Sequence, residues 1–349
     1  MNRDTATRRT YLRTAAAASL VGLGSVAGCL ESRSPYAPPI VSNRPDAVYV
    51  PSHFEGMAPV GMDTDGPVAG ALVYSYPHRF WLVSGTDRSR VRIQPDDTLH
   101  LMLQLWDRES GIPLSGTSPR IRITDEDGVV ADRVFWPMLS QLMGFHYGDN
   151  VQLDGDGRYR VEVSVPPTGD HLVGDLADRL DRGAVLEAEF DWASTNLEEL
   201  AINTIEDERA GSRGALPAMT GMPGPTGLVP ETLPGRRLGT ATIDELGVGG
   251  SVVPTAGEAA QAALVVTIKT PHNGFAMPML GPVATVDGTR HRLQAALDPA
   301  LGMHYRASLG SEAVAGPIEI RLPAPSQVAR HEGYETAFMQ PGTARLTDS

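Results

Sequence analysis

The sequence has one cysteine, Cys29, and one lysine, Lys269, among its 349 residues. A single cysteine excludes an intrachain disulfide and any Cys-x-x-Cys redox or zinc motif. A blue-copper electron carrier needs a cysteine thiolate inside its fold, and Cys29 instead closes an N-terminal apolar run. The sequence also lacks a Gly-x-Ser-x-Gly turn and a glycine-rich phosphate loop after a strand. The common signatures of hydrolases and nucleotide-binding proteins are therefore missing.

Aromatic residues are scarce at 6% of the chain, whereas glycine (37 residues) and proline (28 residues) are plentiful. This composition favours a loop-rich β protein over a helical one. The formal net charge is −13, so we do not expect nucleic acid as a partner. An acidic, lysine-poor chain is typical of a halophilic archaeon. The alternative is an ordinary acidic exported protein.

The N-terminus has the features of an export signal. Arg8 and Arg9 form a twin-arginine pattern, and an alanine-rich apolar run follows over residues 15–26. The run is too short to span a membrane, and it closes with Val-Ala-Gly-Cys at Cys29, which resembles a lipobox. We therefore expect residues 1–29 to be a twin-arginine lipoprotein signal and Cys29 to carry the lipid. The protein is then predicted to be anchored at the extracytoplasmic face of the cell membrane.

Much of the remaining sequence alternates hydrophobic and polar residues. In residues 99–106, four leucines alternate with His100, Met102, Gln104 and Trp106. Such a period of two indicates half-buried antiparallel strands. Turn clusters such as Asp-Gly-Asp-Gly at 154–157 separate the strands, and many short strands with regular turns are typical of a β-sandwich.

The predicted fold class is all-β, with two antiparallel β-sandwiches in tandem. Residues 30–45 are expected to be a tether, and residues 46–195 a metal-binding sandwich. Residues 196–240 are predicted to be a linker, because they are rich in glycine and proline. Residues 241–345 are predicted to form a second, smaller sandwich.

The two predicted sandwiches carry histidines in the same order. Gly-Phe-His-Tyr at residues 144–147 matches Gly-Met-His-Tyr at residues 302–305. The three matched pairs are His78 with His272, His146 with His304, and His171 with His331. This repetition favours a duplicated module.

The histidines of the first sandwich are predicted to converge. If residues 148–153 and 159–165 pair as a hairpin, His146 before it and His171 after it emerge at the same open end. Met138 can return to that end, and His78 is the fourth candidate. A thioether beside imidazoles favours copper over zinc, nickel or iron.

Each ligand ring usually needs a group that orients its second nitrogen. The nearby candidates are Asp149, Asp170 and Asp175. For a single histidine the alternative is a solvated or hydrogen-bonded loop residue. We give this interpretation to His53, His100 and His291, and His100 is further interpreted as a polar residue on the outer face of its strand.

A second metal site is predicted at His272, His304 and His331. Ala296 stands where a counterpart of Met138 is expected, although Met277 and Met279 could supply sulfur from another direction. The alternative is a degenerate copy that is kept for packing. Met219 and Met222 are interpreted as linker composition rather than as a copper(I) site.

These motifs resemble those of the bacterial periplasmic iron-transport protein family. The resemblance extends over roughly residues 55–192. The matching elements are Pro137-Met138, Gly144-Phe145-His146-Tyr147-Gly148-Asp149-Asn150, Pro166-Pro167 and His171. The resemblance implies an immunoglobulin-like sandwich with a copper site of three histidines and one methionine. Carried onto this chain, the ligands are His78, Met138, His146 and His171.

The same resemblance implies iron uptake beside a membrane iron permease and a homodimer of single domains. We expect the second sandwich to replace a partner subunit in part, which would make an intrachain pseudo-dimer. The chain departs from the family after its first histidine, where Arg79-Phe80-Trp81 stands in place of an acidic residue.

We therefore predict a non-enzymatic, membrane-anchored metal-binding protein that supports iron uptake or copper handling, with copper, or iron, as its metal. The alternative function is a structural or adhesive surface β-sandwich lipoprotein without metal. A third hypothesis is an oxidase that acts on ferrous iron.

Overall fold

The computed structural model describes residues 38–254, 262–309 and 316–348. The predicted signal, with Arg8, Arg9 and the lipid site Cys29, lies outside these residues. Within them, no helix is both long and apolar enough to cross a membrane. The helical elements of the described residues are α1 (Leu176–Arg179) and the 3-10 helix η1 (Ser194–Leu197). The predicted all-β class is confirmed.

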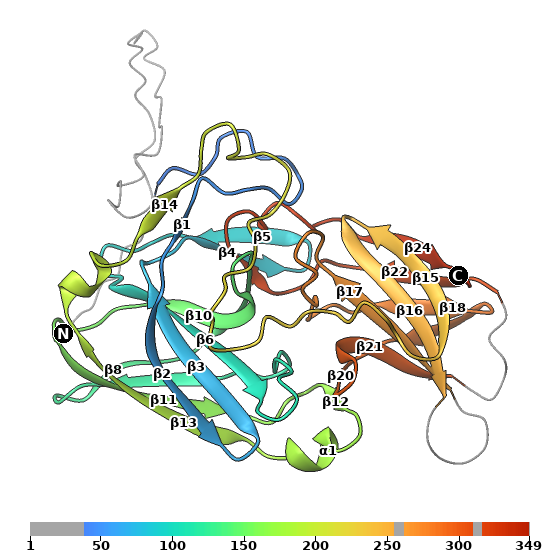
Figure 1. The fold of residues 1–349 in the computed structure, drawn as a ribbon, viewed down its shortest axis with the longest axis horizontal. Helices are drawn as coiled ribbons and strands as arrows, with labels where there is room; N and C mark the ends of the chain where they lie inside the picture. Colours follow the sequence, from blue (N-terminus) through green and yellow to red (C-terminus); the bar gives the residue numbers. More distant parts are fainter. Residues whose placement is uncertain (1–37, 255–261, 310–315, 349) are drawn as a thin grey trace, which may run out of the picture. The chain divides into compact units, whose positions relative to one another are not determined.

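The first module is built from an eight-stranded and a four-stranded sheet (Figure 1). In spatial order the eight-stranded sheet contains β2 (Ala58–Asp65), β3 (Val68–Ser75), β6 (Leu99–Asp107), β10 (Gly144–Val151), β9 (Trp136–Ser140), β23 (Ala329–Arg330), β4 (Phe80–Ser84) and β5 (Asp87–Val91). The four-stranded sheet contains β13 (Ala184–Trp192), β11 (Gly157–Val165), β7 (Arg120–Thr124) and β8 (Val129–Val134). A separate ribbon pairs β1 (His53–Glu55) with β14 (Ile202–Thr204).

The second module is built from a six-stranded and a four-stranded sheet. The six-stranded sheet contains β12 (His171–Leu172), β20 (Gln294–Asp298), β21 (Gly302–Leu309), β17 (Ala262–Lys269), β16 (Leu246–Pro254) and β15 (Arg236–Ile243). The four-stranded sheet contains β19 (Thr289–Arg292), β18 (Val283–Val286), β22 (Ile318–Leu322) and β24 (Gly342–Leu346).

The strand order of the second module is repeated within the first. The order β2-β3-β6-β10-β9-β23 in the first module matches β15-β16-β17-β21-β20-β12 in the second, and β13-β11-β7-β8 matches β24-β22-β18-β19. Among the described strands of these sheets, those of the β4–β5 hairpin in the first module have no counterpart in the second. The shared order supports the predicted duplication.

The two modules exchange one short strand each. β12 follows β11 of the first module in sequence, yet it pairs in parallel with β20 of the second. β23 follows β22 of the second module, yet it lies between β9 and β4 of the first, with Ala329 opposite Met138 and Arg330 opposite Leu139. The modules are therefore interlocked, which a simple tandem arrangement does not include.

The inner face of the first module is a conventional apolar core. Leu101 and Leu103 of β6 pack in the same cluster as Val161 and Val163 of β11. All nine residues of β6 are buried, so its other face is covered as well. That outer face carries His100, because residues two apart on a strand share a face.

The cover of the outer face comes from the segment between the modules. Within the predicted linker 196–240, the amide of Leu216 donates to the side-chain oxygen of Gln141 over 2.7 Å. The amide of Gly224 donates to the side-chain oxygen of Gln104 over 3.1 Å. This segment therefore lies on the sheet and shields the polar side chains beneath it.

The hairpin predicted from residues 148–153 and 159–165 is wrong. β10 pairs with β6 and β9, whereas β11 pairs with β7 and β13 in the opposite sheet. The Asp-Gly turn at 154–157 thus carries the chain from one sheet to the other. The alternating pattern shows which face of each strand is buried, but it does not show which strand pairs with it.

Candidate metal site

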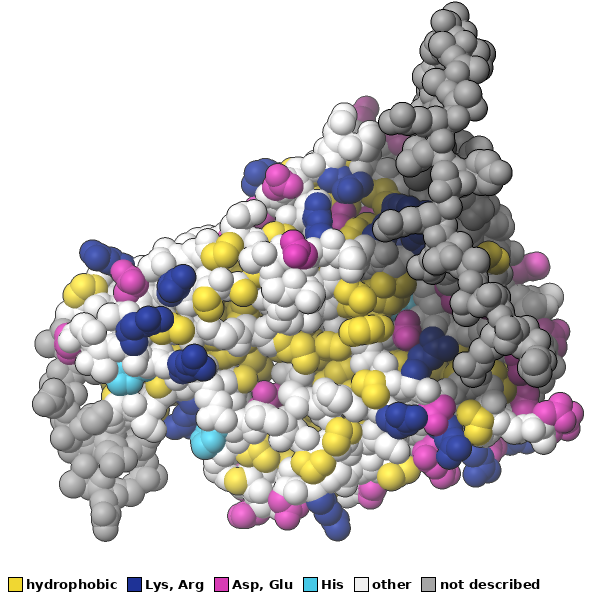
Figure 2. All heavy atoms as spheres, turned by 180° about the vertical axis from the view of Figure 1, so that it is seen from behind, with side chains coloured by type: hydrophobic (Ala, Val, Ile, Leu, Met, Phe, Trp, Pro, Cys, Tyr) yellow, Lys and Arg dark blue, Asp and Glu magenta, His cyan; other side chains and the backbone are white. Residues whose placement is uncertain are grey.

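Three histidines converge on the outer face of the eight-stranded sheet, and two of them, His100 and His146, are buried. The side chains of His100, His146 and His331 each offer a ring nitrogen, and these atoms lie within 4.8 Å of one another. In the described part of the chain, no other set of three or more His, Cys, Asp or Glu side chains is close enough to share a metal ion. Few histidines are visible on the face shown in Figure 2.

Met138 faces His146 across the pair β9–β10, where the two residues are direct cross-strand partners. The Met138 side chain is fully buried. The neighbouring Gly148 shows where its sulfur lies: a Cβ atom at that glycine would be 3.2 Å from Met138 Sδ and 3.0 Å from His100 Nε2. The thioether and the His100 nitrogen therefore both border the space that a side chain at position 148 would fill.

Hydrogen bonds at Nδ1 fix the tautomers of His100 and His146. His146 Nδ1 lies 3.1 Å from the carbonyl oxygen of Gly144, so it donates a proton there. His100 Nδ1 lies 2.8 Å from Asn150 Oδ1. In both rings Nε2 is left with a lone pair, which is the form that binds a metal.

Asn150 also holds the backbone of His78. Its Nδ2 donates to the His78 carbonyl over 2.9 Å, and its Oδ1 accepts from the His78 amide over 3.0 Å. These two bonds fix the orientation of the amide and hence the proton on His100. The orienting groups are thus an amide and a carbonyl, and the predicted Asp149 instead forms an ion pair with Arg133.

His331 reaches the site because β23 has crossed into the first module. Its amide donates to the carbonyl of Leu139 over 3.1 Å. The preceding Arg330 is fully buried and donates to the carbonyls of Ser326, Ala337 and Phe338. This guanidinium anchors the strand that carries the ligand.

The imidazoles are neutral in the folded protein. Burial lowers the pKa of His146 to about 4 and holds the pKa values of His100 and His331 well below their usual value. Within the described residues, Nε2 of each of these three rings is buried and has no hydrogen-bond partner. Buried polar atoms normally have partners, so three unpaired nitrogens that face one another fit a metal ion.

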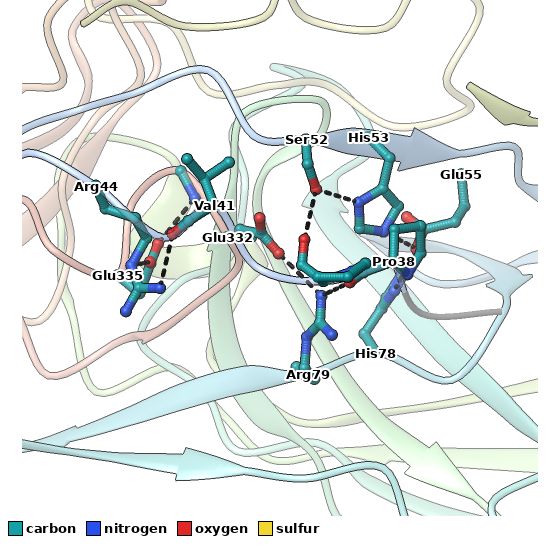
Figure 3. Close-up of polar contacts among 12 residues, drawn as sticks. Pro38, Val41, Arg44, Ser52, His53, Glu55, His78, Arg79, Glu332 and Glu335 are labelled. Carbon is teal, nitrogen blue, oxygen red and sulfur yellow. Dashed lines mark hydrogen bonds and ion pairs between the residues drawn. The ribbon is translucent and has the colours of Figure 1, made fainter. Parts of the chain in front are cut away.

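The ring of His78 lies beside those of His100 and His331. Its ring centroid lies 4.6 Å from that of His100 and 5.3 Å from that of His331. Figure 3 shows that His78 and His53 both point toward Glu55. Glu55 Oε1 lies 3.6 Å from His78 Nδ1 and 3.0 Å from His53 Nε2. Burial alone would raise the pKa of Glu55, but the two histidines outweigh it and the pKa is lowered.

Arg79 ties the two segments that carry His78 and His331. Its guanidinium pairs with Glu332 at 3.2 Å (Figure 3). Arg79, at the position where the predicted resemblance implies an acidic residue, therefore braces the strand exchange. Glu55, from the ribbon β1–β14, supplies a carboxylate to His78 instead.

A narrow cavity leads from the surface to this group. Its volume is ≈ 80 Å³, and His78, His331, Glu55 and several methionines line it. His331 is partly exposed toward it. An ion can therefore approach the histidines from this side.

His171 lies elsewhere, in the second module. It is exposed on β12, opposite Ala296, and lines a pocket with His291 and Arg306. The match between His171 and His331 is displaced by two residues. Val173, not His171, is the counterpart of His331, because its amide donates to the Leu297 carbonyl just as His331 donates to Leu139.

The second module keeps one ligand of the site. His304 occupies the position of His146, with Nδ1 3.1 Å from the Gly302 carbonyl. The strand pairings place Ala296 at the position of Met138, Ala263 at that of His100 and Arg306 at that of Gly148. The second module thus has no counterparts of Met138 and His100, and an arginine stands where the first module has Gly148, so the ligand set is incomplete there.

The other members of the predicted second site also lie apart. His272 is exposed in the turn after β17, the counterpart of β6, and so does not correspond to His78. His331 lies with His146 of the first module, at 5.2 Å between ring centroids. The structure therefore does not bring His272, His304 and His331 together.

Sequence reasoning missed His100 as a member of the group and placed His331 in the wrong module. His100 alternates with leucines, which marks it as facing away from the core, but the pattern does not reveal that another segment covers that face. No local signal identifies the partner of a two-residue strand such as β23.

Two family models match parts of the chain. Residues 119–192 match the model described as Fe2+ transport protein, and residues 231–347 match a Domain of unknown function (DUF7350). None of the curated proteins matches the chain.

The chain is also similar to solved structures. FetP from uropathogenic Escherichia coli is 20% identical, with a TM-score of 0.30 over 39% of this chain and 96% of that one. A copper-bound variant of the P19 protein from Campylobacter jejuni is 17% identical, with a TM-score of 0.29 over 40% of this chain and 98% of that one. The family match over residues 119–192 confirms the predicted resemblance for this part of the first module, which contains Met138 and His146.

Proposed function

We propose that this protein is a non-enzymatic, extracytoplasmic metal-binding protein whose site holds copper. The observation that carries the proposal is the convergence of His100, His146 and His331 within 4.8 Å, next to the sulfur of Met138. Neutral imidazoles with a thioether favour copper over harder ions. When bound, copper would supply a soft, redox-capable cation in a buried environment.

The residues around the ligands have defined tasks. Asn150 and the Gly144 carbonyl hold the protons of His100 and His146 on Nδ1, away from the metal. Arg330 and Arg79 hold the exchanged strand, and the covering segment contacts Gln141 and Gln104 beside the site. Such contacts to the residues that bind the metal raise the metal affinity without adding a ligand.

In the cell, we propose that the protein is exported by the twin-arginine route and anchored by Cys29. It would support iron uptake or copper handling beside a membrane permease. The support for this is the family match over residues 119–192 together with the N-terminal sequence pattern. A purely adhesive sandwich gives no reason for three buried and unpaired imidazole nitrogens.

The test is metal analysis and copper titration of the purified protein with a matched pair of variants. His146→Ala removes a ligand, whereas His304→Ala removes its counterpart in the second module, which has the same carbonyl contact. We expect one tightly bound copper per chain in the wild type and in His304→Ala. His146→Ala should lose it. Equal copper affinity in all three proteins would refute the site.

A further inference from the structure

Four methionines form a cluster beside the metal site. Met102 and Met143 are buried against Val73, and Met57, Met222 and Leu142 pack around them. This group of thioethers, here called the methionine cluster, is separate from the main apolar core of the module. It includes four of the twelve methionines of the chain, which come together from four separate segments.

The methionine cluster is built on the same elements as the metal site. Met102 lies two residues after His100 on β6 and is the cross-strand partner of Gly148. Met143 lies in the turn between β9 and β10, three residues before His146. Met57 follows Glu55 by two residues. Met102 therefore shares a face of the sheet with His100, and Met57 and Met143 lie within three residues of Glu55 and His146.

The cavity joins the two groups. Its lining includes Met57, Met102 and Met143 as well as His78 and His331. Methionine is often a flexible filler of irregular core space, but a filler closes the space beside it. Here three methionines line a passage that stays open, and its lining also includes His331, whose Nε2 has no partner among the described residues.

The chemistry of these side chains selects one form of the metal. Thioethers are soft, neutral ligands that favour Cu(I) over Zn(II), Fe(II) and Cu(II). Thioethers carry no proton, and the rings of His100, His146 and His331 are neutral. Movement of the ion from sulfur to these imidazoles therefore changes neither the number of bound protons nor the oxidation state of the copper. Glu55, at the same cavity, offers the cation a compensating charge.

We propose that the methionine cluster is an entrance that accepts Cu(I) and passes it to the histidines. The proposal rests on the proposed copper site and adds the oxidation state and the route. Thioethers exchange Cu(I) without forming the strong, closed site of thiolates, and the downstream imidazoles retain the ion because they are enclosed and preoriented.

The experiment compares two triple variants with the wild type. Met57→Leu, Met102→Leu and Met143→Leu remove the sulfur from the passage with nearly constant volume. Met62→Leu, Met277→Leu and Met303→Leu form the control, since these residues lie outside the cavity. Cu(I) is transferred anaerobically from a chromophoric Cu(I) chelator, and the loading rate and the equilibrium affinity are recorded.

We expect the passage variant to load Cu(I) about tenfold more slowly, which corresponds to roughly 1.4 kcal/mol in the barrier. The equilibrium affinity of the histidine site and the rate of Cu(II) loading should stay within about threefold of the wild type, the scale of a small environmental effect. The control variant should behave as the wild type does. An unchanged Cu(I) loading rate in the passage variant would refute the proposed entrance but not the proposed copper site.

A second measurement needs no variant of the passage. Silver(I), a redox-inert probe of Cu(I) sites, is titrated into wild-type protein with labelled methionine methyl groups. The signals of Met57, Met102 and Met143 should shift before that of Met62. Shifts confined to Met138 would contradict the entrance, and a wild type that binds neither Cu(I) nor Cu(II) would instead refute the copper site itself.

Discussion

The backbone amide of His331 donates a hydrogen bond of 3.1 Å to the carbonyl of Leu139, although 192 positions separate the two residues (331 − 139). Leu139 follows Met138, so this bond sets a histidine of the second module beside the thioether of the first. The second module therefore completes the candidate site by contributing a ligand.

This contribution predicts the effect of His331→Ala. Because one imidazole is lost, we expect copper affinity to fall by at least about 100-fold, the upper range for loss of an outer contact. Competition against a copper chelator of known affinity measures it. Val173→Ala changes the counterpart position, and it should leave the affinity unchanged; a similar loss in both variants would mean that the strand and not the imidazole matters.

Gly148→Ala tests the space between the two ligands. The added methyl would lie 3.0 Å from His100 Nε2 and 3.2 Å from Met138 Sδ, so both must move apart. We expect weaker copper binding and a changed copper–sulfur signal in X-ray absorption, with the fold retained. Gly157→Ala is the control, since a Cβ there meets nothing within 4 Å. Wild-type affinity in Gly148→Ala would contradict the placement of the sulfur.

Asn150→Ala tests the fixed tautomer. Without the 2.8 Å bond from His100 Nδ1, the proton is free to move to Nε2 and compete with the metal. We expect a loss in copper affinity of about 10–100-fold and mixed tautomer signals for His100 in nitrogen NMR. Ser308→Ala, at the matching position of the second module, should have no effect on copper. A single unchanged tautomer in Asn150→Ala would show that another group orients the ring.

The metal-free protein should lose stability in mild acid. His146 has a pKa of about 4 when folded because it is buried, against about 6.5 when unfolded. The unfolded chain then binds the extra proton first, so stability is complete above about pH 6.5 and declines as the pH falls toward 4. This single group accounts for roughly 3 kcal/mol.

Denaturant unfolding at several pH values measures this decline. In His146→Ala the slope between pH 6.5 and 4 should be smaller, whereas the exposed His272→Ala should retain the wild-type slope. Bound copper should raise stability over the same range, because it binds only the folded form. A pH profile identical in His146→Ala and wild type would refute the buried neutral ring.

The strand content and part of the site can be predicted from the sequence, because they depend on residues that are close together along the chain. The alternating leucines of residues 99–105 identify β6, and the Gly-Phe-His-Tyr motif places His146 on a strand beside Met138. The counterpart Gly-Met-His-Tyr correctly marks His304 at the same position. These features depend on side-chain periodicity and on short spacings, which a sequence displays directly.

The rest depends on contacts that the sequence does not display. The hairpin prediction fails because Asp-Gly turns connect strands between sheets as readily as within one. The sequence predicts His171 as a ligand because it follows the prolines at 166–167, but its strand pairs with the second module. His331 arrives by the reverse exchange, and the position of both histidines depends on which sheet a two-residue strand joins.

The exchange of β12 and β23 also fixes when the metal site can first exist. A nascent chain that has reached residue 200 already holds Met138, His100 and His146, but the strand that delivers His331 has not yet been synthesised. Half-finished protein should therefore emerge from the ribosome unable to hold the ion firmly. Co-translational loading is thus disfavoured, and the completed polypeptide must add β23 to the first module before it can take up its metal.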